Sequence, residues 1–254
     1  MRVRRLTERR PWTFLVAAGI LKPLLITSSS RTWIDGEKIP PTGGCIVAVN
    51  HISHVDPLTM AHFVFDHGRI PRYLAKSGLF ENRALAGFLT SAGQIPVERL
   101  SRNAIGAYDA AVAAVRDGDC VVIYPEGTLT RDPELWPMKG KSGAARIALA
   151  TGCPVIPVGQ WGAHEILPPY AKVPDLFPRK HLIMKAGDPV PLEDLLESPP
   201  STEIIAAATD RIMVAITALV AELRGTAPPT DRFDARQAGI EQIGNPNKKK
   251  DTSR

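Results

Sequence analysis

Strand patterns and helix patterns alternate along this chain from residue 45 onward, and this alternation constrains its fold more than any other feature. Continuous apolar runs at 45–49 and 120–124 are typical of strands covered on both faces, and 154–161 is predicted to be a third strand. Weaker strand patterns lie at 71–75 and 181–187. Helical patterns cover 57–66, 84–93, 101–118, 143–152 and 201–225. The sequence therefore predicts an α/β fold with a mixed, mostly parallel sheet flanked by helices.

The residues that border these helices suit helix ends. Asp56 stands in the capping position before Pro57, which fits a first helical turn, and Ser101 stands in the same position before a later helix. Gly118 and Gly152 come at the ends of two helices, where glycine readily adopts the left-handed conformation. We expect the helices to begin and end at these signals.

The N-terminal residues combine a basic block with an apolar block. "MRVRRLTERR" carries five arginines, and "PWTFLVAAGILKPLLI" follows at once. This apolar stretch is shorter than the ~20 residues that cross a bilayer, and Lys22-Pro23 interrupts it. We expect a helix, or a pair broken at Pro23, in the membrane interface, with Trp12 and Trp33 at headgroup depth and the arginines facing anionic lipid. A basic tail followed by a core helix is the alternative.

The chain divides into three parts by composition. Residues 1–35 are the expected interfacial anchor, and residues 36–225 carry the alternating patterns. Residues 226–254 contain proline, charge and asparagine without periodicity, so we expect this tail to be disordered. No secretory signal with a small-residue cleavage site follows the N-terminus.

Charge and aromatic content narrow the classes of ligand. The 254 residues carry a formal net charge of +5, which fits nucleic acid, a membrane surface or a phosphorylated small molecule. Aromatic residues make up only 6% and do not interleave with the cations, so we expect no nucleic-acid partner. Cys45, Cys120 and Cys153 lie in or beside apolar segments and are expected to be buried free thiols in a reducing compartment.

The segment "VNHISHVDP" places two histidines and an aspartate at the carboxyl end of a buried strand, where α/β proteins usually build their sites. A metal site of His51, His54 and Asp56 is one hypothesis, but the spacing differs from the H-x-H-x-D-H pattern of dinuclear hydrolases. A helix cap with a polar loop residue is the plainest interpretation. The third is a dyad in which Asp56 orients His51, whose other ring nitrogen acts as general base.

Such a base has no protein nucleophile to activate in this sequence. The chain contains no G-x-S-x-G elbow, and none of its cysteines is a plausible active thiol. The base would therefore activate a hydroxyl group of the substrate, which fits direct transfer to an acceptor alcohol and not a covalent enzyme intermediate.

A second motif, "YPEGTLTRD", follows the strand predicted at 120–124. Gly127 and Thr128 offer a backbone amide and a hydroxyl group to an oxyanion or a phosphate, and a plain turn would not explain Glu126 before them. Several cations stand near the predicted strand ends: Lys76, Arg99, Arg102, Arg131, Lys139 and Lys141. They are either scattered surface charges or a phosphate site, which needs only two or three converging cations.

Four blocks of the chain resemble, in order and spacing, those of the glycerolipid acyltransferase family, most closely the 1-acylglycerol-3-phosphate (lysophosphatidate) O-acyltransferases. "NHISHVDP" is similar to the family's N-H-x-x-x-x-D block, and "GQIPVER" to its G-x-[IV]-x-x-x-R block. "YPEGTLTRD" is similar to its F-P-E-G-T block, and "GCPVIPV" to its V-I-P-V block. The resemblance covers roughly residues 40–165.

The resemblance implies that residues 36–225 form an acyltransferase domain. This domain would move an acyl group from a thioester of coenzyme A, or of acyl carrier protein, to a free glycerol hydroxyl of a lysophospholipid acceptor. His51 would be the catalytic base and Asp56 its orienting partner, and Lys76 and Arg99 would hold the phosphate of the acceptor. No metal and no cofactor besides the acyl thioester are implied.

Further roles follow from the same resemblance. Glu126, Gly127 and Thr128 would help to form the acceptor pocket. The backbone near Val158 and Gly159 is a weaker candidate for polarising the thioester carbonyl. Members of the family are typically attached to the cytoplasmic face of the membrane, which agrees with the N-terminal pattern.

Two departures from the family pattern lie on the acceptor side. The family usually has an arginine directly after E-G-T, where this chain has Leu129, and Arg131 is the expected replacement. The family often has a glutamate at the position of Gly78. Another lysophospholipid or a glycolipid therefore stays open as the acceptor. A non-catalytic lipid-binding module and a metal-dependent hydrolase stay open as alternatives to the acyltransferase.

Overall fold

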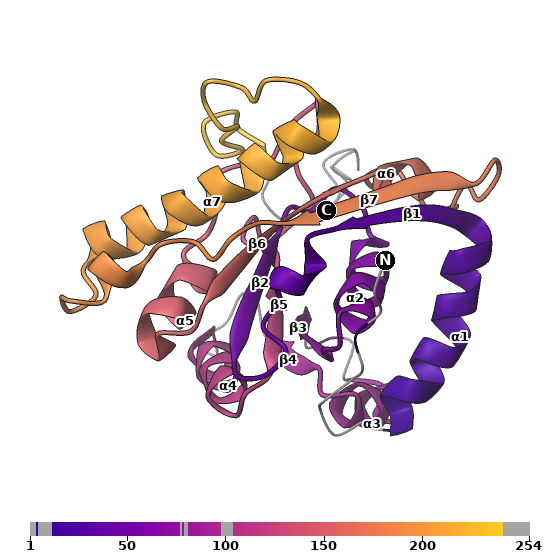
Figure 1. Cartoon of the computed structure of the whole chain (residues 1–254), viewed down its shortest axis with the longest axis horizontal. Coiled ribbons are helices and arrows are strands. Elements are labelled where there is room, and N and C mark those ends of the chain that lie inside the picture. The colour runs from indigo at the N-terminus through magenta and orange to yellow at the C-terminus, as the bar shows by residue number, and fades with distance from the viewer. Residues whose placement is uncertain (1–3, 5–11, 77, 79–80, 98–103, 241–254) are drawn as a thin grey trace, which may run out of the picture.

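A computed structural model of the chain describes residue 4 and residues 12–76, 78, 81–97 and 104–240. Within them, strands form one sheet in the order β1-β7-β6-β2-β5-β3-β4 (Figure 1). The strands are β1 (Ser29–Ile34), β2 (Cys45–Val49), β3 (Pro71–Lys76), β4 (Ile95–Val97), β5 (Cys120–Ile123), β6 (Val155–Trp161) and β7 (Lys180–Ala186). The helices are α1 (Trp12–Ser28), α2 (Asp56–Asp66), α3 (Arg83–Ser91), α4 (Ala104–Arg116), α5 (Gly143–Thr151), α6 (Ala163–Ile166) and α7 (Thr202–Arg224), with short 3₁₀ turns at Gly36–Lys38 and Glu193–Leu195.

Most neighbouring strands of the sheet run parallel. β2 lies between β5 and β6 and is parallel to both, and β3 and β4 continue the sheet in the same direction. β7 is antiparallel to β6 and parallel to the edge strand β1. The predicted mixed, mostly parallel sheet is confirmed, and its centre consists of β6, β2 and β5, which are almost entirely buried.

The two faces of the sheet bury separate apolar clusters. Ile46 and Ala48 of β2 belong to a cluster with α4, α5 and α7, whereas Val47 and Val49 belong to a cluster with α2. This division follows from the two-residue period of a strand. Figure 1 accordingly shows α4, α5 and α7 on one side of the sheet and α1, α2 and α3 on the other.

The predicted helices form, with ends within three residues of those expected. The Ser101 cap lies outside the described residues. Ser201 caps α7 by accepting a hydrogen bond from Ile204 N at 3.2 Å, and Gly225, with φ 62°, ends it. By length and composition α7 could span a membrane, yet one face of it packs against β6 and α5.

The N-terminal part supplies an edge strand as well as a helix. α1 is one continuous helix that contains Pro23, not a broken pair, and it leads without a loop into β1. β1 pairs with β7 and so belongs to the sheet, although it lies before the boundary that was expected after residue 35. Trp12 and Ile20 are 70% and 66% exposed. Trp33 is half-buried against α2, so it does not share the exposed position of Trp12.

The segment after α7 has defined contacts as far as residue 240. Lys139 N donates a hydrogen bond to Phe233 O at 3.0 Å, and Ala235 is buried. From composition we expected disorder from residue 226. Lys139, the partner of Phe233, lies almost 100 residues earlier in the chain, so no local sequence pattern could indicate this contact. Residues 241–254 lie outside the described part.

Candidate functional site

The loops that carry the two predicted motifs meet at the carboxyl edge of the sheet. β2 and β5 are parallel neighbours, paired from Cys45–Cys120 to Ala48–Ile123. The segments that follow them therefore leave the sheet side by side. A hydrogen bond from Thr130 N to His51 O, at 2.8 Å, joins the two loops directly.

Asn50, the residue directly after β2, fixes the start of the first loop. It exchanges three hydrogen bonds with Gln160 of β6, at distances between 2.7 and 3.1 Å. Both residues are fully buried, so removing either would leave polar groups of the other unsatisfied. Sequence reasoning did not find this link, although Asn50 opens the N-H-x-x-x-x-D block.

His51 and Asp56 form the expected dyad. His51 Nδ1 lies 2.8 Å from Asp56 Oδ2, and the same oxygen accepts hydrogen bonds from the backbone N–H groups of Ile52 and Ser53 at 2.7 and 2.9 Å. Because a carboxylate oxygen accepts, Nδ1 carries the proton, which leaves the lone pair on Nε2. The Asp56 side chain is fully buried, whereas that of His51 is 15% exposed.

The capping role expected for Asp56 is wrong. The position before α2 is occupied by Val55, without a side-chain hydrogen bond, and Asp56 is the first helical residue. Its carboxylate turns back into the loop instead of forward along the helix, because the two amides and the imidazole lie there. The aspartate thus orders the loop and orients the histidine at once.

Aromatic rings hold the His51 imidazole from one side. The ring of Tyr124 stacks on it, with centroids 4.2 Å apart and planes at 27°, and Tyr73 lies beyond Tyr124 at 6.5 Å. The Tyr73 hydroxyl donates to Pro57 O at 2.7 Å. Burial raises the pKa of both tyrosines well above the usual value, so they stay neutral. The family block has phenylalanine where Tyr124 stands, and that was the only sequence signal for this stack.

Glu126 connects the two loops through its carboxyl group. Oε1 accepts from His51 N at 2.9 Å, and Oε2 accepts from Met138 N at 3.0 Å. The side chain is buried, and burial raises its pKa to about 8, although the two backbone hydrogen bonds act in the opposite direction. Glu126 therefore positions the backbone of the loop that carries His51, a role that sequence reasoning did not assign to it.

The residues from Gly127 to Arg131 differ in their burial and contacts. Gly127 has φ 68°, where a side chain would be strained, and a Cβ there would lie 3.0 Å from the side chain of Lys141 and displace it. Thr128 is half-buried. Leu129, at the family's usual arginine position, is buried in the interior. Arg131 is also buried, with its guanidinium 4.7 Å above the ring of Tyr170.

The remaining predicted residues are not all placed at the site. Lys76 is the last residue of β3, two strands from β2, and its side chain is outside what the structure describes. Arg99 lies outside the described residues. Val158 and Gly159 are paired within the sheet, and a Cβ on Gly159 would lie 3.0 Å or less from atoms of α7. A thioester therefore cannot approach them from the α7 face.

His54 stands apart from the dyad. Its ring meets Tyr170 edge-on at 6.1 Å, and partial burial, followed by the nearby His51, lowers its pKa. Within the part of the chain that the structure describes, no group of three or more His, Cys, Asp or Glu residues has metal-site geometry. Cys45 and Cys120 are buried and form no disulfide bond, as expected, and Cys153 is partly buried.

Comparison with known proteins places this geometry in a family. Residues 31–161, just over half of the chain, match the family model described as Acyltransferase. A 1-acyl-sn-glycerol-3-phosphate acyltransferase of Bacillus subtilis is 27% identical over 195 residues, which cover 77% of this chain and 90% of that protein. A chloroplastic 1-acyl-sn-glycerol-3-phosphate acyltransferase of Brassica napus is 30% identical over 141 residues, 54% of this chain. The match spans only 39% of the Brassica napus protein.

A solved structure shares the fold. The crystal structure of the 1-acyl-sn-glycerophosphate (LPA) acyltransferase from Thermotoga maritima superposes with a TM-score of 0.63, covering 85% of this chain and 81% of that one, at 21% identity. The architecture of sheet and helices is thus one that a protein with that activity also adopts. At this identity the likeness concerns the fold alone.

Proposed function

Because this chain belongs to the Acyltransferase family, we propose that it transfers a fatty acyl group from an acyl thioester to the free glycerol hydroxyl of a lysophosphatidate, giving phosphatidate in phospholipid synthesis. One observation carries the reaction type: His51 Nδ1 lies 2.8 Å from Asp56 Oδ2, which leaves Nε2 as the base. Both residues lie within residues 31–161, which match the family model, and similar proteins include 1-acyl-sn-glycerol-3-phosphate acyltransferases.

The reaction proceeds in one addition and one elimination. His51 Nε2 takes the proton of the acceptor hydroxyl, and the hydroxyl oxygen forms a bond to the carbonyl carbon of the thioester. The tetrahedral intermediate collapses, the carbon–sulfur bond breaks, and the thiolate leaves with the proton that His51 returns. Asp56 keeps the imidazole in the correct tautomer and stabilises its cationic form during the reaction.

Two features support direct transfer without an acyl-enzyme. Cys45 and Cys120 are buried in the strands and lie among apolar side chains. Burial raises the pKa of the third cysteine, Cys153, which lowers its thiolate fraction. The acyl thioester of coenzyme A, or of acyl carrier protein, is then the co-substrate, and the dyad requires neither a metal nor another cofactor for these steps.

The acceptor is the finer part of this proposal. Lys76, Arg99 and Arg131, with Gly127 and Thr128, are its proposed ligands. Leu129 supports the alternative of a different lysophospholipid or a glycolipid, because its buried aliphatic side chain replaces the arginine that is usual in the family.

We also propose that α1 attaches the protein to the cytoplasmic face of the membrane, as a peripheral or monotopic protein. Apolar side chains on α1 are exposed to a degree unusual for a soluble surface: Trp12, Leu15, Val16, Ile20 and Leu24. Lys22 on the same helix is paired with Asp66, so its charge is compensated on the protein side. A helix of this kind fits the headgroup region, where apolar side chains enter the acyl chains.

The test is an assay of purified full-length protein with lysophosphatidate and a long-chain acyl-CoA. Free thiol release and the lipid product are measured with and without chelator. We expect thiol release that chelator does not change and one equivalent of phosphatidate per thiol. Thiol release without an acylated lipid would indicate a thioesterase and contradict the proposal.

A second set of acceptors separates the reaction from its substrate. If lysophosphatidate is inert but another lyso-lipid or a glycolipid is acylated, then the transfer chemistry stands and the acceptor assignment is wrong. Activity that chelator abolishes would favour the metal-dependent alternative over the dyad.

A further inference from the structure

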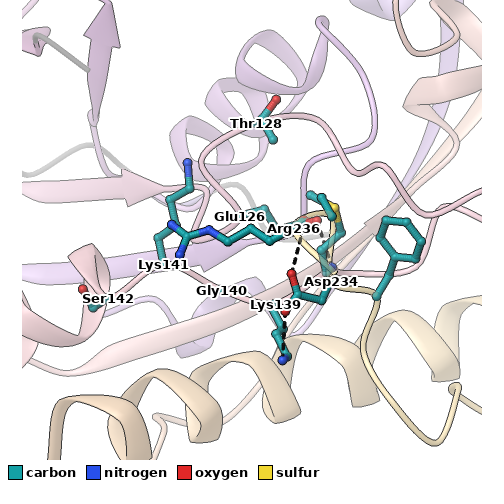
Figure 2. A pocket seen from close by; sticks show the side chains of 11 residues that line it. Glu126, Thr128, Lys139, Gly140, Lys141, Ser142, Asp234 and Arg236 are labelled. Carbon is teal, nitrogen blue, oxygen red and sulfur yellow. Dashed lines mark hydrogen bonds and ion pairs between the residues drawn. The ribbon is translucent and has the colours of Figure 1, made fainter. Parts of the chain in front are cut away.

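A pocket lies beside the E-G-T turn and is not explained by the dyad. It has a volume of about 440 Å³ and lies between the Glu126–Thr128 turn, residues 138–142 before α5, and residues 233–236 after α7 (Figure 2). This size is typical of a site for a small molecule or part of one. Residues 233–236 lie beyond the segment that matches the family model, so this wall of the pocket belongs to the C-terminal part of the chain.

The pocket carries an excess of positive charge. Lys139, Lys141 and Arg236 line it, and Figure 2 shows their side chains around the space. One carboxylate, Asp234, opposes them, and it pairs with Lys139 at 3.0 Å, a contact that lowers the pKa of Asp234. The other carboxyl group, Glu126, has a pKa of about 8 and is mostly protonated at neutral pH. Three cations thus face one charged carboxylate.

Hydrogen bonds fix the backbone of the segments that carry these cations. Lys141 N donates to Pro125 O at 2.8 Å, and its side chain passes within 3.0 Å of the position that a Cβ of Gly127 would occupy. Lys139 N donates to Phe233 O at 3.0 Å, which ties the C-terminal segment to the loop before α5. Arg236 N donates to Asp234 Oδ1 at 2.9 Å, which fixes the backbone of Arg236.

The pocket is connected to the catalytic loop. Glu126 lines it, and the Oε1 atom of Glu126 accepts from His51 N at 2.9 Å. A ligand in the pocket is therefore separated from the backbone of the dyad by one side chain. This proximity suits a part of the substrate that does not react itself but holds the reacting group near His51.

The position of the pocket argues for a ligand that arrives from water. Its walls include the segments that flank α5 and α7, on one side of the sheet, whereas α1 with its exposed apolar side chains packs against α2 and α3 on the other (Figure 1). A lipid headgroup delivered from a membrane under α1 would reach the Glu126–Thr128 turn from that opposite side and not through this pocket. The soluble co-substrate has no such restriction.

We propose that this pocket binds the phosphate groups of the acyl donor, a coenzyme A-type thioester, with Arg236, Lys141 and Lys139 as the cationic ligands. The inference rests on the proposed function, since it names the site of one of the two substrates. Guanidinium and ammonium groups form charge-assisted hydrogen bonds with phosphate oxygens, and several of them suit a ligand with several phosphates. The C-terminal segment then belongs to the donor site, because it supplies Arg236.

The experiment measures binding of free coenzyme A to the full chain by calorimetry, which requires no turnover. Arg236→Gln and Lys141→Gln are each expected to weaken binding about tenfold, the loss typical of one charged hydrogen bond. Arg116→Gln, a change of the same charge at the C-terminal end of α4, is the matched control and is expected to bind coenzyme A as the wild type does. Coenzyme A without its 3′-phosphate is expected to bind more weakly to the wild type.

Kinetics identify which substrate occupies the pocket. Arg236→Gln is expected to raise KM for acyl-CoA about tenfold and to leave KM for the lysolipid and kcat nearly unchanged. A rise in KM for the lysolipid alone would assign the pocket to the acceptor phosphate and overturn the proposal. Unchanged coenzyme A binding in both pocket variants would overturn it as well.

The outcome also separates this inference from the function. If coenzyme A binds in an Arg236-dependent manner but no lipid is acylated, then the pocket is assigned correctly and the proposed reaction is wrong. If acylation is observed and the variants bind coenzyme A as the wild type does, then the reaction stands and the donor site lies elsewhere.

Discussion

His51 with Asp56, and His62 with Asp66, are the two histidine–aspartate pairs within 4 Å in the described residues, and their surroundings differ. His51 and Asp56 are five residues apart across the turn after β2, with Nδ1 2.8 Å from Oδ2. His62 and Asp66 are four residues apart on α2, where that spacing places side chains on one face, and Nε2 lies 3.3 Å from Oδ2.

The partners of the two carboxylates explain the difference. Asp56 binds two backbone amides of its own loop and the imidazole, and the histidine keeps a free ring nitrogen at the surface. Asp66 instead receives Lys22 from α1 and the indole N–H of Trp33 from β1, and its histidine is buried. The first pair is open to a substrate, and the second pair fastens the N-terminal elements to the domain. The same two residue types thus have a proposed catalytic role in one pair and a structural role in the other, according to what they leave exposed.

The largest effect that distinguishes the pairs is expected from removing each imidazole. His51→Ala should lower kcat about 10³-fold, since general-base catalysis is lost, with little change in the free energy of unfolding. His62→Ala should leave kcat within about threefold and lower the free energy of unfolding by about 2 kcal/mol, because a buried ring is removed. Thiol-release assays and urea unfolding measure the two quantities. Equal loss of activity in both variants would break the comparison.

The carboxylates give the next contrast. Asp66→Asn should lower the free energy of unfolding by about 2 kcal/mol, because Lys22 loses its charged partner while staying partly solvated. Burial alone would raise the pKa of Asp66, but its contacts with His62, Lys22 and Trp33 lower it well below the usual 3.8. A lowered pKa means that this stabilisation is present above pH 3.8 and is lost only in stronger acid, so the deficit of the variant should be the same at pH 5 and pH 7.

Asp56→Asn is the matched control for Asp66→Asn. It should lower kcat by roughly 10²-fold or more, because the amide no longer selects the tautomer with the proton on Nδ1. If Asp56→Asn released α1 and Asp66→Asn stopped the reaction, then the assignment of the two pairs would be reversed. Limited proteolysis near α1 reports the release.

The last prediction concerns the third carboxyl group, Glu126, whose Oε1 accepts from His51 N. Its folded pKa of about 8 lies above the ordinary value of 4.5, so the stabilisation from its protonated form is complete below pH 4.5 and is lost as the pH rises toward 8. The free energy of unfolding of the wild type should therefore decrease as the pH rises from 4.5 to 8. This decrease should be smaller in Glu126→Gln. Urea titrations at pH 5 and pH 8 test this, and identical slopes in both proteins would contradict it.

The elements that sequence predicts well are those determined by local patterns. Apolar periodicity predicts the buried strands and the helices. The five-residue separation of His51 and Asp56 across one turn predicts their contact. The family resemblance, carried by four short blocks, is confirmed by the match of residues 31–161.

What sequence did not reveal depends on contacts between distant residues. Gln160 meets Asn50, Phe233 meets Lys139, and the amide of Met138 meets Glu126, and no local pattern encodes such pairs. The capping role of Asp56 was wrong for the same reason, since capping statistics describe a helix without its neighbouring loop. The edge strand β1 was hidden within the segment assigned to the anchor.

The direct passage from α1 into β1 has a geometric consequence. α1 ends at Ser28 and β1 begins at Ser29, so there is no flexible linker between the helix proposed to lie in the bilayer and the rigid sheet. Domains on flexible linkers tumble above a surface and meet it in many orientations. With α1 seated, this sheet would keep one height and one tilt, and every lipid diffusing in two dimensions would encounter the imidazole of His51 from the same direction.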